Sequence, residues 1–373
     1  MTSDFYLPSN FPFMLDACFK PRTHPWHVFD KDTQEWKSVR PPWPAAVPQI
    51  QYEPTKTRVI DDLPEKEYNV LRLITWSIDA FVPFTRERVD AALDHLNKFV
   101  LPPYTKDSPP VIIMFQEMVE AGIEQVRKTK WVQERFAITN FDTRGFDAPY
   151  GTLTLIQVGE APGAAKEFKH DMMTLRIANV FRVRWLSKFW RDGLFVDIEA
   201  TVTGKNGCKE TKALRICNTH LDSLSSAHPI RPQQVAKATS YLEEEIIHGG
   251  VLAGDMNAIQ ASDDRIAEDN KLKDAYLVLG GEEGVVEGCT WGYQRTSDKH
   301  EYFRPERLDK VFYRGGFVAR ALTRIGMGVV VEGEETKARM MARGLGFWVT
   351  DHYGLMADLE IVEVVEVKEK KEN

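Results

Sequence analysis

Residues 250–257 read Gly-Val-Leu-Ala-Gly-Asp-Met-Asn, an apolar run that is followed at once by polar residues. The apolar run predicts a strand over Gly250 to Gly254. Side chains at the end of a strand point out of the core toward a rim, where open α/β architectures place their sites. Asp255 and Asn257 are therefore candidate site residues, although Gly-Asp-x-Asn by itself is commonly a plain turn.

Four more polar clusters each follow an apolar run elsewhere in the chain. They are Thr75-Trp76-Ser77-Ile78-Asp79, Gln116-Glu117, Asn218-Thr219-His220 and Thr350-Asp351-His352. One such cluster is ordinary, because a strand-end glutamate is commonly solvated and a lone histidine is commonly structural. Their recurrence along one chain indicates a shared site at the ends of several strands.

The chain from Leu71 onward alternates short apolar runs with turns and predicts more strands than helices. The candidate strands are Leu71–Trp76, Val111–Phe115, Gly151–Val158, Leu194–Ala200, Ala213–Thr219, Gly250–Gly254, Leu308–Tyr313 and Gly354–Ile361. Two amphipathic helices are predicted, each with apolar residues on one face. In the first helix these residues are Val89, Ala92, Leu93, Leu96 and Val100. In the second they are Val235, Ala238, Leu242 and Ile246. Pro232 near the start of the second helix and Gly249 beyond its end are the expected punctuation. We predict an α/β (α+β) four-layer sandwich, in which two mixed, mainly antiparallel sheets pack face to face with helices outside.

The domain organisation predicted from the sequence has three parts. Residues 1–65 are rich in Pro and Trp and predict an irregular arm packed on the domain, with a disordered interaction tail as the alternative. Residues 66–363 form one enzyme-sized domain. Residues 364–373 end in mixed Lys and Glu and predict a charged, flexible tail.

Composition limits the class of protein. Hydrophobic residues make up 43% and charged residues 28% of 373 residues, which is ordinary globular composition. The net charge of −7 gives no general affinity for nucleic acid, so any phosphate binding has to be local. The four cysteines contain no C-x-x-C pair and predict reduced thiols. We expect no membrane span, no signal peptide, an intracellular location in the nucleus or cytoplasm, and a monomer.

The order and wording of the five clusters resemble the endonuclease/exonuclease/phosphatase superfamily, whose members include DNase I-like nucleases. The resemblance runs from about Leu71 to Ile361, and its motifs are specific jointly although each one alone is weak. It implies a divalent-metal-dependent phosphodiesterase. Such an enzyme has to neutralise charge on the phosphate, activate a water and assist the leaving oxygen.

The resemblance assigns a metal role to two acidic residues. Glu117 matches the family's metal ligand, and Asp351 matches the carboxylate beside the catalytic histidine and supports the metal shell. Mg²⁺ favours hard oxygen ligands and keeps several waters, so one or two protein carboxylates suffice. We expect Mg²⁺ as the cofactor, with Mn²⁺ as an alternative, and an N-terminal cap as the plain reading of Asp351.

The resemblance assigns catalytic roles to five further residues. His352 binds the scissile phosphate or acts as general base, and Asp309 is the carboxylate that fixes its tautomer. Asp255 positions or deprotonates the attacking water, Asn257 contacts phosphate, and His220 contacts a phosphate oxygen. In the plain reading, Asp309 bonds a turn amide and His352 is an ordinary surface imidazole.

The first motif departs from the family pattern. The family reads T-W-N-x-D or S-W-N-x-D, whereas this chain has Ser77 at the asparagine position. A serine hydroxyl is shorter than an amide and lacks its separate carbonyl and amino groups. A water can bridge the missing length; otherwise the site is weakened and the protein is a catalytically impaired binding module.

Finer matches resemble one branch, the tyrosyl-DNA phosphodiesterases that act on 5′ ends, and their microbial and fungal relatives. Among these matches are Tyr150-Gly151-Thr152-Leu153-Thr154, His220-Leu221-Asp222-Ser223, Cys289-Thr290-Trp291 and Arg307-Leu308-Asp309. The branch implies a nucleic-acid 5′ end as partner, with a covalent protein adduct as one substrate form. It places Ser223 and Trp291, with Ser77, on the substrate side; core packing is the alternative for Trp291. A small phosphoester, an inositol phosphate or a phospholipid is the alternative substrate class.

One further stretch, Phe181 to Arg191, interleaves basic and aromatic side chains. Such a pattern gives a local positive surface that suits nucleic acid. Alternating arginine and apolar residues are also typical of a half-buried strand, and we favour the strand.

Overall fold

The structure is a computed structural model that describes residues 19–40, 69–101, 108–158, 168–169, 173–203, 208–227, 229–296 and 304–363. Its core is formed by two sheets, with eight strands each among these residues. The order in the first sheet is β1-β9-β10-β11-β12-β14-β13, with β8 beside β9, and the order in the second is β15-β16-β4-β5-β7-β6-β2-β3. Only β11–β12 and β4–β5 are parallel among the described strand pairs, so both sheets are mixed and mainly antiparallel.

The first sheet contains the strands β1 (Pro21–Thr23), β8 (Phe168–Lys169), β9 (Met173–Arg184), β10 (Asp192–Thr203), β11 (Lys209–His220), β12 (Gly249–Asp255), β13 (Lys273–Asp274) and β14 (Asp309–Gly315). The second contains β2 (Trp26–Asp30), β3 (Glu35–Val39), β4 (Val70–Ser77), β5 (Val111–Met118), β6 (Phe136–Ile138), β7 (Gly151–Gln157), β15 (Phe317–Ile325) and β16 (Gly354–Ile361). All of the strands predicted from the apolar runs are present, within a few residues of their predicted ends.

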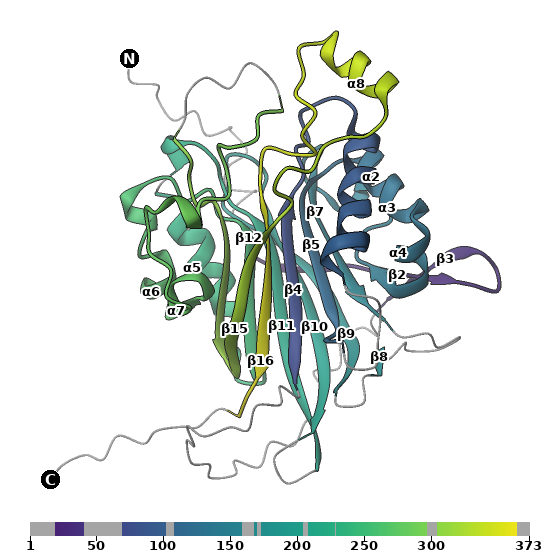
Figure 1. Ribbon diagram of the computed structural model, residues 1–373. Coiled ribbons are helices and arrows are strands. Elements are labelled where there is room, and N and C mark those ends of the chain that lie inside the picture. The colour runs from purple at the N-terminus through teal and green to yellow at the C-terminus, as the bar shows by residue number, and fades with distance from the viewer. Residues whose placement is uncertain are drawn as a thin grey trace, which may run out of the picture.

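The α-helices are α2 (Thr85–His95), α3 (Glu120–Lys128), α4 (Lys130–Arg135), α5 (Arg231–Leu242), α6 (Ile266–Asp269), α7 (Ala275–Val278) and α8 (Glu334–Met341). Figure 1 shows α2, α3 and α4 on one side of the paired sheets and α5, α6 and α7 on the other. Three apolar clusters fill the spaces between these layers: one between the sheets, one under α2 and α3, and one under α5. The predicted four-layer sandwich is confirmed.

The first predicted helix is confirmed, and the second is wrong at its end. The first helix continues beyond α2 as a π-helical turn, Leu96–Val100, and its predicted apolar face packs in one cluster. The second helix has its proline in the first turn but ends at Leu242. Ile246 therefore lies outside it and is exposed, and Gly249 is the first residue of β12 rather than a helix stop.

The prediction of an irregular arm over residues 1–65 is wrong for residues 19–40. β1 pairs with β9 in the first sheet, and the β2–β3 hairpin pairs with β6 in the second sheet. The segment therefore adds one strand to the first sheet and two strands to the second. Apolar residues such as Trp26 and Phe29 are buried there, which offsets the entropy of ordering the chain. The rest of that arm and the tail 364–373 lie outside the described residues.

Two smaller predictions can also be compared with the structure. Cys208, Cys217 and Cys289 are free thiols, while Cys18 lies outside the described residues. No helix in the described ranges is both long and apolar enough to cross a membrane.

The topology explains why the polar clusters meet. Each sheet contains a parallel pair joined by a crossover helix, β4–α2–β5 in one and β11–α5–β12 in the other. Parallel neighbours present their carboxyl ends at the same edge, and antiparallel neighbours present their starts there. β14 and β16 run antiparallel to β12 and β4, so their first residues lie at that edge too.

Candidate active site

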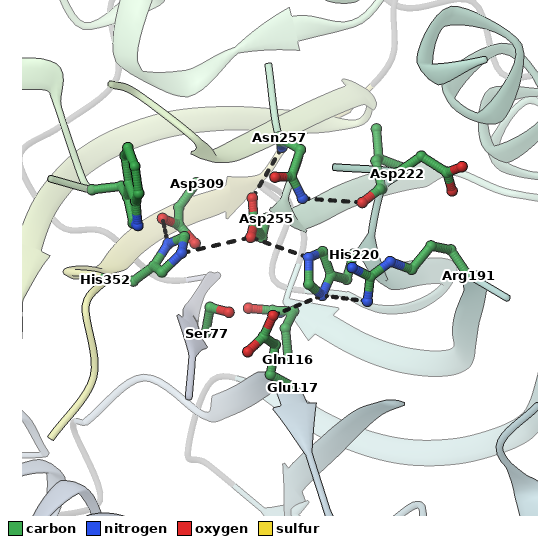
Figure 2. A network of polar contacts seen from close by, with 12 residues as sticks. Ser77, Gln116, Glu117, Arg191, His220, Asp222, Asp255, Asn257, Asp309 and His352 are labelled. Carbon is green, nitrogen blue, oxygen red and sulfur yellow. Dashed lines mark hydrogen bonds and ion pairs between the residues drawn. The ribbon is translucent and has the colours of Figure 1, made fainter. Parts of the chain in front are cut away.

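His220, Asp255 and Asp309 form one row across three adjacent strands. His220 is in register with Asp255, and Asp255 is in register with Asp309. The second sheet faces this row with Ser77 at the end of β4 and Glu117 near the end of β5. His352, just before β16, completes the ring of side chains in Figure 2.

A buried amide pair fixes the two sheets to each other beneath this ring. The Gln116 side chain donates to Asn218 Oδ1 at 2.8 Å, and the Asn218 amide donates to the Phe115 carbonyl at 3.2 Å. Both amides are fully buried, so losing either partner leaves an unsatisfied polar group. The pair therefore holds the end of β5 against the end of β11.

His352 and Asp309 form the predicted histidine–carboxylate pair. His352 Nδ1 lies 2.8 Å from Asp309 Oδ2, and both side chains are buried. The indole of Trp76 donates to the His352 carbonyl at 3.1 Å, which fixes the backbone of that residue. Although burial lowers the pKa of His352, the carboxylates of Asp309, Asp255 and Asp351 raise it well above the usual value. The surrounding carboxylates therefore favour the protonated form of His352.

Asp255 lies between the two histidines. Its Oδ2 is 3.3 Å from His220 Nε2 and 3.7 Å from His352 Nε2, and its Oδ1 accepts the Asn257 backbone N–H at 2.9 Å. Burial raises the pKa of Asp255 to about 6. The carboxylate is thus fixed in place and can exchange a proton near neutral pH.

The backbone around Asp255 requires glycine at position 254. Gly254 has a φ of 142°, and a Cβ there would lie 1.8 Å from the Thr219 carbonyl oxygen. Asn257 also has a positive φ, 47°, and its amide donates to the Leu221 carbonyl at 3.0 Å. The bond holds the Asn257 side chain toward the end of β11, on the ring side of the sheet (Figure 2).

Both ring nitrogens of His220 have protein partners. Arg191 Nη1 lies 3.0 Å from Nδ1, and a guanidinium can only donate, so Nδ1 accepts. The proton of the neutral ring is then on Nε2, which faces Asp255. Burial, Arg191 and His352 lower the pKa of His220 well below its usual value. The predicted contact between His220 and a phosphate oxygen would have to replace one of these partners.

Glu117 stands on a β-bulge. The β5–β7 register shifts between Phe115 and Met118, and Glu117 itself has a φ of 61°. Such a conformation is uncommon outside glycine and clusters at functional sites. It turns the carboxylate out of the sheet, where Oε2 accepts the Ala80 N–H at 2.9 Å. Burial, together with the nearby carboxylates of Asp351 and Asp79, raises the pKa of Glu117 to about 8.

Asp351 is oriented by Trp291. The indole N–H of Trp291 donates to Asp351 Oδ2 at 2.8 Å, and the backbones of Trp291 and His352 form a bridge. Asp351 also contributes to a raised pKa at Asp79, whose first cause is burial. Trp291 therefore holds a carboxylate of the site, and its predicted contact with substrate stays a prediction.

The acidic side chains offer two groups of possible cation ligands. Asp255, Asp309 and His352 bring one ligand atom each within 4.8 Å of one another. His352 Nδ1 already pairs with Asp309 Oδ2, so that nitrogen is not available to a metal. Glu117 with Asp351 is the better fit, because the repulsion that raises the pKa of Glu117 is relieved by a divalent cation.

Ser77 and Ser223 differ in their position relative to the site. Ser77 is 1% exposed, its hydroxyl has no partner among the described residues, and Figure 2 shows it beside Gln116 and Glu117. Its carbonyl accepts from Thr350, so the strand end is fixed although the side chain is short. Ser223 lies beyond the end of β11 and is half-buried, and its contact with substrate stays a prediction.

Sequence reasoning missed Arg191. The Phe181–Arg191 stretch was predicted to be strand, yet β9 ends at Arg184 and residues 185–191 form the connection to β10. The alternation of arginine and apolar residues continues from β9 into the connecting loop, so the pattern did not show where the strand ends. Arg191, the last residue of that loop, points into the site. The signal that could have found it was the cluster of basic and aromatic residues itself.

Comparison with known proteins places this geometry in a family. A profile of the Endonuclease/Exonuclease/phosphatase family matches residues 68–352. The chain belongs to the endonuclease/exonuclease/phosphatase family. The protein is therefore a hydrolase of the nuclease and phosphatase kind, as the motif order predicted. A search of curated proteins finds no significant match.

Several solved structures share the fold of this endonuclease/exonuclease/phosphatase family member. TDP2 from D. rerio in complex with a single-strand DNA product is 17% identical, covers 78% of this chain and 98% of its own, and has a TM-score of 0.53. A humanized D. rerio TDP2 is 16% identical with coverage of 78% and 98% and a TM-score of 0.52. TDP2 from Caenorhabditis elegans is 16% identical with coverage of 78% and 74% and a TM-score of 0.51. The predicted likeness to the tyrosyl-DNA phosphodiesterase branch is thus confirmed for the fold.

Proposed function

We propose that this protein is a divalent-metal-dependent phosphodiesterase that hydrolyses a phosphodiester at a DNA 5′ end. The observation that carries the proposal is Asp255 between His220 and His352, at 3.3 and 3.7 Å. Burial and Arg191 lower the pKa of His220, whereas the carboxylates of Asp309, Asp255 and Asp351 raise the pKa of His352. Groups whose environments push their pKa values apart are typical of acid–base catalysis.

Asp255 is the proposed acceptor of the proton of the attacking water. His220 and the Asn257 N–H fix both of its oxygens, so the carboxylate is oriented before substrate arrives. Preorganised groups lower the cost of reaching the transition state. Asn257, held by the Leu221 carbonyl, contributes its side-chain oxygen or amide to the water or the phosphate.

His352 is the proposed contact to the scissile phosphate. Asp309 occupies Nδ1, which leaves the Nε2–H to donate to a non-bridging phosphate oxygen. A cationic imidazole also stabilises the charge that develops on phosphate in the transition state. Between the two roles predicted from sequence, the charge on His352 favours phosphate binding over general base.

Glu117 and Asp351 are the proposed ligands of the metal ion, with Ser77 beside them. When bound, Mg²⁺ neutralises phosphate charge and polarises the phosphoryl oxygens. Trp291 and the Ala80 N–H orient the two carboxylates toward that position. Mn²⁺ is an alternative, because oxygen ligands suit both ions.

The DNA 5′ end is supported by the likeness in fold to a TDP2 that was crystallised with a single-strand DNA product. The test uses an oligonucleotide that carries a 5′-phosphotyrosyl group, with Mg²⁺, and measures release of tyrosine. We expect turnover by the native protein and none above background with Glu117→Gln. Glu124→Gln, on the exposed face of α3, is the matched control and should keep native activity. Absence of turnover by folded, metal-loaded native protein on this substrate refutes the 5′-end assignment.

The second candidate is a binding module without catalysis, which is favoured by the buried hydroxyl of Ser77, since it has no partner among the residues that the structure describes. If Ser77→Asn creates turnover that the native protein lacks, this candidate is supported. Native turnover that Glu117→Gln abolishes excludes it. A screen of inositol phosphates and phospholipid head groups separates the remaining substrate classes by their released products.

A further inference from the structure

Arg191 is a buried cation without a carboxylate partner among the described residues. Its side chain belongs to a residue that is only 7% exposed, and its Nε has no hydrogen-bond partner there. The other buried arginines of the first sheet are neutralised: Arg182 pairs with Asp192 at 2.8 Å and Arg215 pairs with Asp197 at 2.6 Å. A buried charge is costly unless it is paired, and Arg191 has only the more distant carboxylates of Glu117 and Asp255, so an anionic ligand would complete its surroundings.

Aromatic rings hold the guanidinium in place. Its central carbon lies 4.9 Å from the centroid of Tyr150 and 5.6 Å from that of Phe189. Stacking of this kind favours the planar cation and leaves its edge N–H groups available. Arg191 also donates to His220 Nδ1 at 3.0 Å, so its direction into the site is fixed (Figure 2).

The backbone before Arg191 is arranged to turn it inward. Trp190 has a φ of 59°, which is unusual for a bulky residue, and its side chain is 46% exposed. The chain therefore presents Trp190 to solvent and Arg191 to the interior on consecutive residues. Strain of this type persists where the surrounding structure requires it, commonly at functional sites.

The guanidinium borders a hollow next to the proposed metal ligand. Tyr150, Phe189, Arg191 and His220 line this hollow. Its two carboxylates, Asp147 and Asp192, are each paired with an arginine, Arg184 and Arg182. Glu117 Oε1 lies 3.9 Å from His220 Nδ1, the same atom that Arg191 contacts. A carboxylate suited to a cation and a guanidinium suited to an anion thus flank one imidazole.

We propose that Arg191 and this hollow form an anion subsite that binds phosphate oxygens of the substrate. The inference rests on the proposed phosphodiester chemistry and adds a phosphate-binding residue to it. Because Nδ1 of His220 already accepts from Arg191, the guanidinium rather than that imidazole nitrogen meets the phosphate on this side of the site. Tyr150 and Phe189 act as positioning residues, since they hold the guanidinium without needing to touch the phosphate.

The test measures phosphate binding directly, without metal and without turnover. Inorganic phosphate, phenyl phosphate and phenol are titrated into the metal-free full chain, and binding is followed by calorimetry and NMR. We expect both phosphates to bind the native protein and phenol not to compete with inorganic phosphate. Arg191→Gln should lower phosphate affinity by about 10- to 100-fold, the range for hydrogen bonds to charged groups. The phosphate affinity of Arg191→Lys should lie between those of the native protein and Arg191→Gln, because lysine keeps the charge and loses the planar guanidinium.

Arg215→Gln is the matched control. Arg215 is likewise buried and lies 5.1 Å over the Phe181 ring, but Asp197 and Glu244 neutralise it. Its replacement should leave phosphate affinity within about twofold of native, provided that thermal unfolding shows a folded protein. Should Arg191→Gln fail to fold, Arg191→Lys carries the same comparison.

The outcomes separate this inference from the proposed function. Phosphate affinity in Arg191→Gln or Arg191→Lys that equals the native value overturns the subsite, whatever the turnover. Arg191-dependent phosphate binding by a protein that does not cleave the 5′-phosphotyrosyl oligonucleotide supports the subsite and refutes the 5′-end assignment. Binding of phenol in competition with inorganic phosphate overturns the assignment to phosphate and indicates an aromatic pocket.

Discussion

The substitution Asp309→Asn removes the charge that keeps His352 cationic while keeping the shape of the side chain. Asp309 is 0% exposed and its Oδ2 lies 2.8 Å from His352 Nδ1, so water cannot replace the lost carboxylate. An asparagine can still accept a hydrogen bond, but it no longer raises the pKa of the imidazole. The variant therefore tests the role of the charge rather than that of the contact.

The magnitude follows from the charge that His352 offers to the phosphate. Removing one preorganised contact to the charge that develops in the transition state costs about 2.7 to 4 kcal/mol. Each 1.36 kcal/mol is about tenfold in rate, so we expect kcat to fall by about 10²- to 10³-fold.

The assay is steady-state release of tyrosine from the 5′-phosphotyrosyl oligonucleotide at saturating Mg²⁺. KM should change by less than about threefold, because the imidazole held by Asp309 chiefly stabilises the charge that develops in the transition state. The control is Asp358→Asn, which breaks the ion pair between Asp358 in β16 and Arg72 in β4 and should retain the native kcat. A folded Asp309→Asn variant with kcat within tenfold of native refutes the proposed role of the buried pair.

Two further predictions concern stability. Gly254→Ala places a Cβ against the Thr219 carbonyl at 1.8 Å and needs an unfavourable φ of 142°. It should therefore lower the free energy of unfolding, measured with urea, by more than about 3 kcal/mol. An unchanged midpoint contradicts this steric account. Burial and, after it, Arg182 lower the pKa of His24 from 6.5 to about 3. Between these two pH values the unfolded chain binds a proton that the folded chain does not bind. The contribution of neutral His24 to the free energy of unfolding is therefore full above pH 6.5 and is lost as the pH falls toward 3. At pH 5 the loss is about 2 kcal/mol, so the His24→Gln variant should lose less stability than the native protein between pH 7 and pH 5. Equal losses argue against a neutral His24 in the folded protein.

The strands and the site motifs could be predicted because they depend on local chain properties. A strand such as β12 is buried on both faces, so its apolar residues are continuous, and the polar Asp255 marks its end. The early strands β1–β3 were missed because they are short and interrupted by turns, and the Pro and Trp content suggested irregular chain. Their pairing with β9 and β6 depends on partners that lie far away in the sequence.

The roles of single atoms at the site could not be predicted in this way. The motif predicts that His220 contacts phosphate, and it does not predict that Arg191 lies on one nitrogen and Asp255 on the other. Trp291 was predicted on the substrate side, with core packing as the alternative, and neither predicts that its indole N–H orients Asp351. Hydrogen-bond partners depend on distances and angles between side chains, which sequence spacing does not encode.

The sequence by itself determined the family, the order of the strands along the chain and the positions of the polar residues that follow them. Apolar runs and turn residues suffice for this, because each strand buries its own residues wherever it packs. Only the tertiary structure decided which polar residues face each other. The Gln116–Asn218 bond joins residues 102 positions apart, and Arg191 meets His220 through the turn at Trp190. Contacts of this kind are set by the packing of the two sheets and by one backbone angle, and neither leaves a local pattern in the sequence.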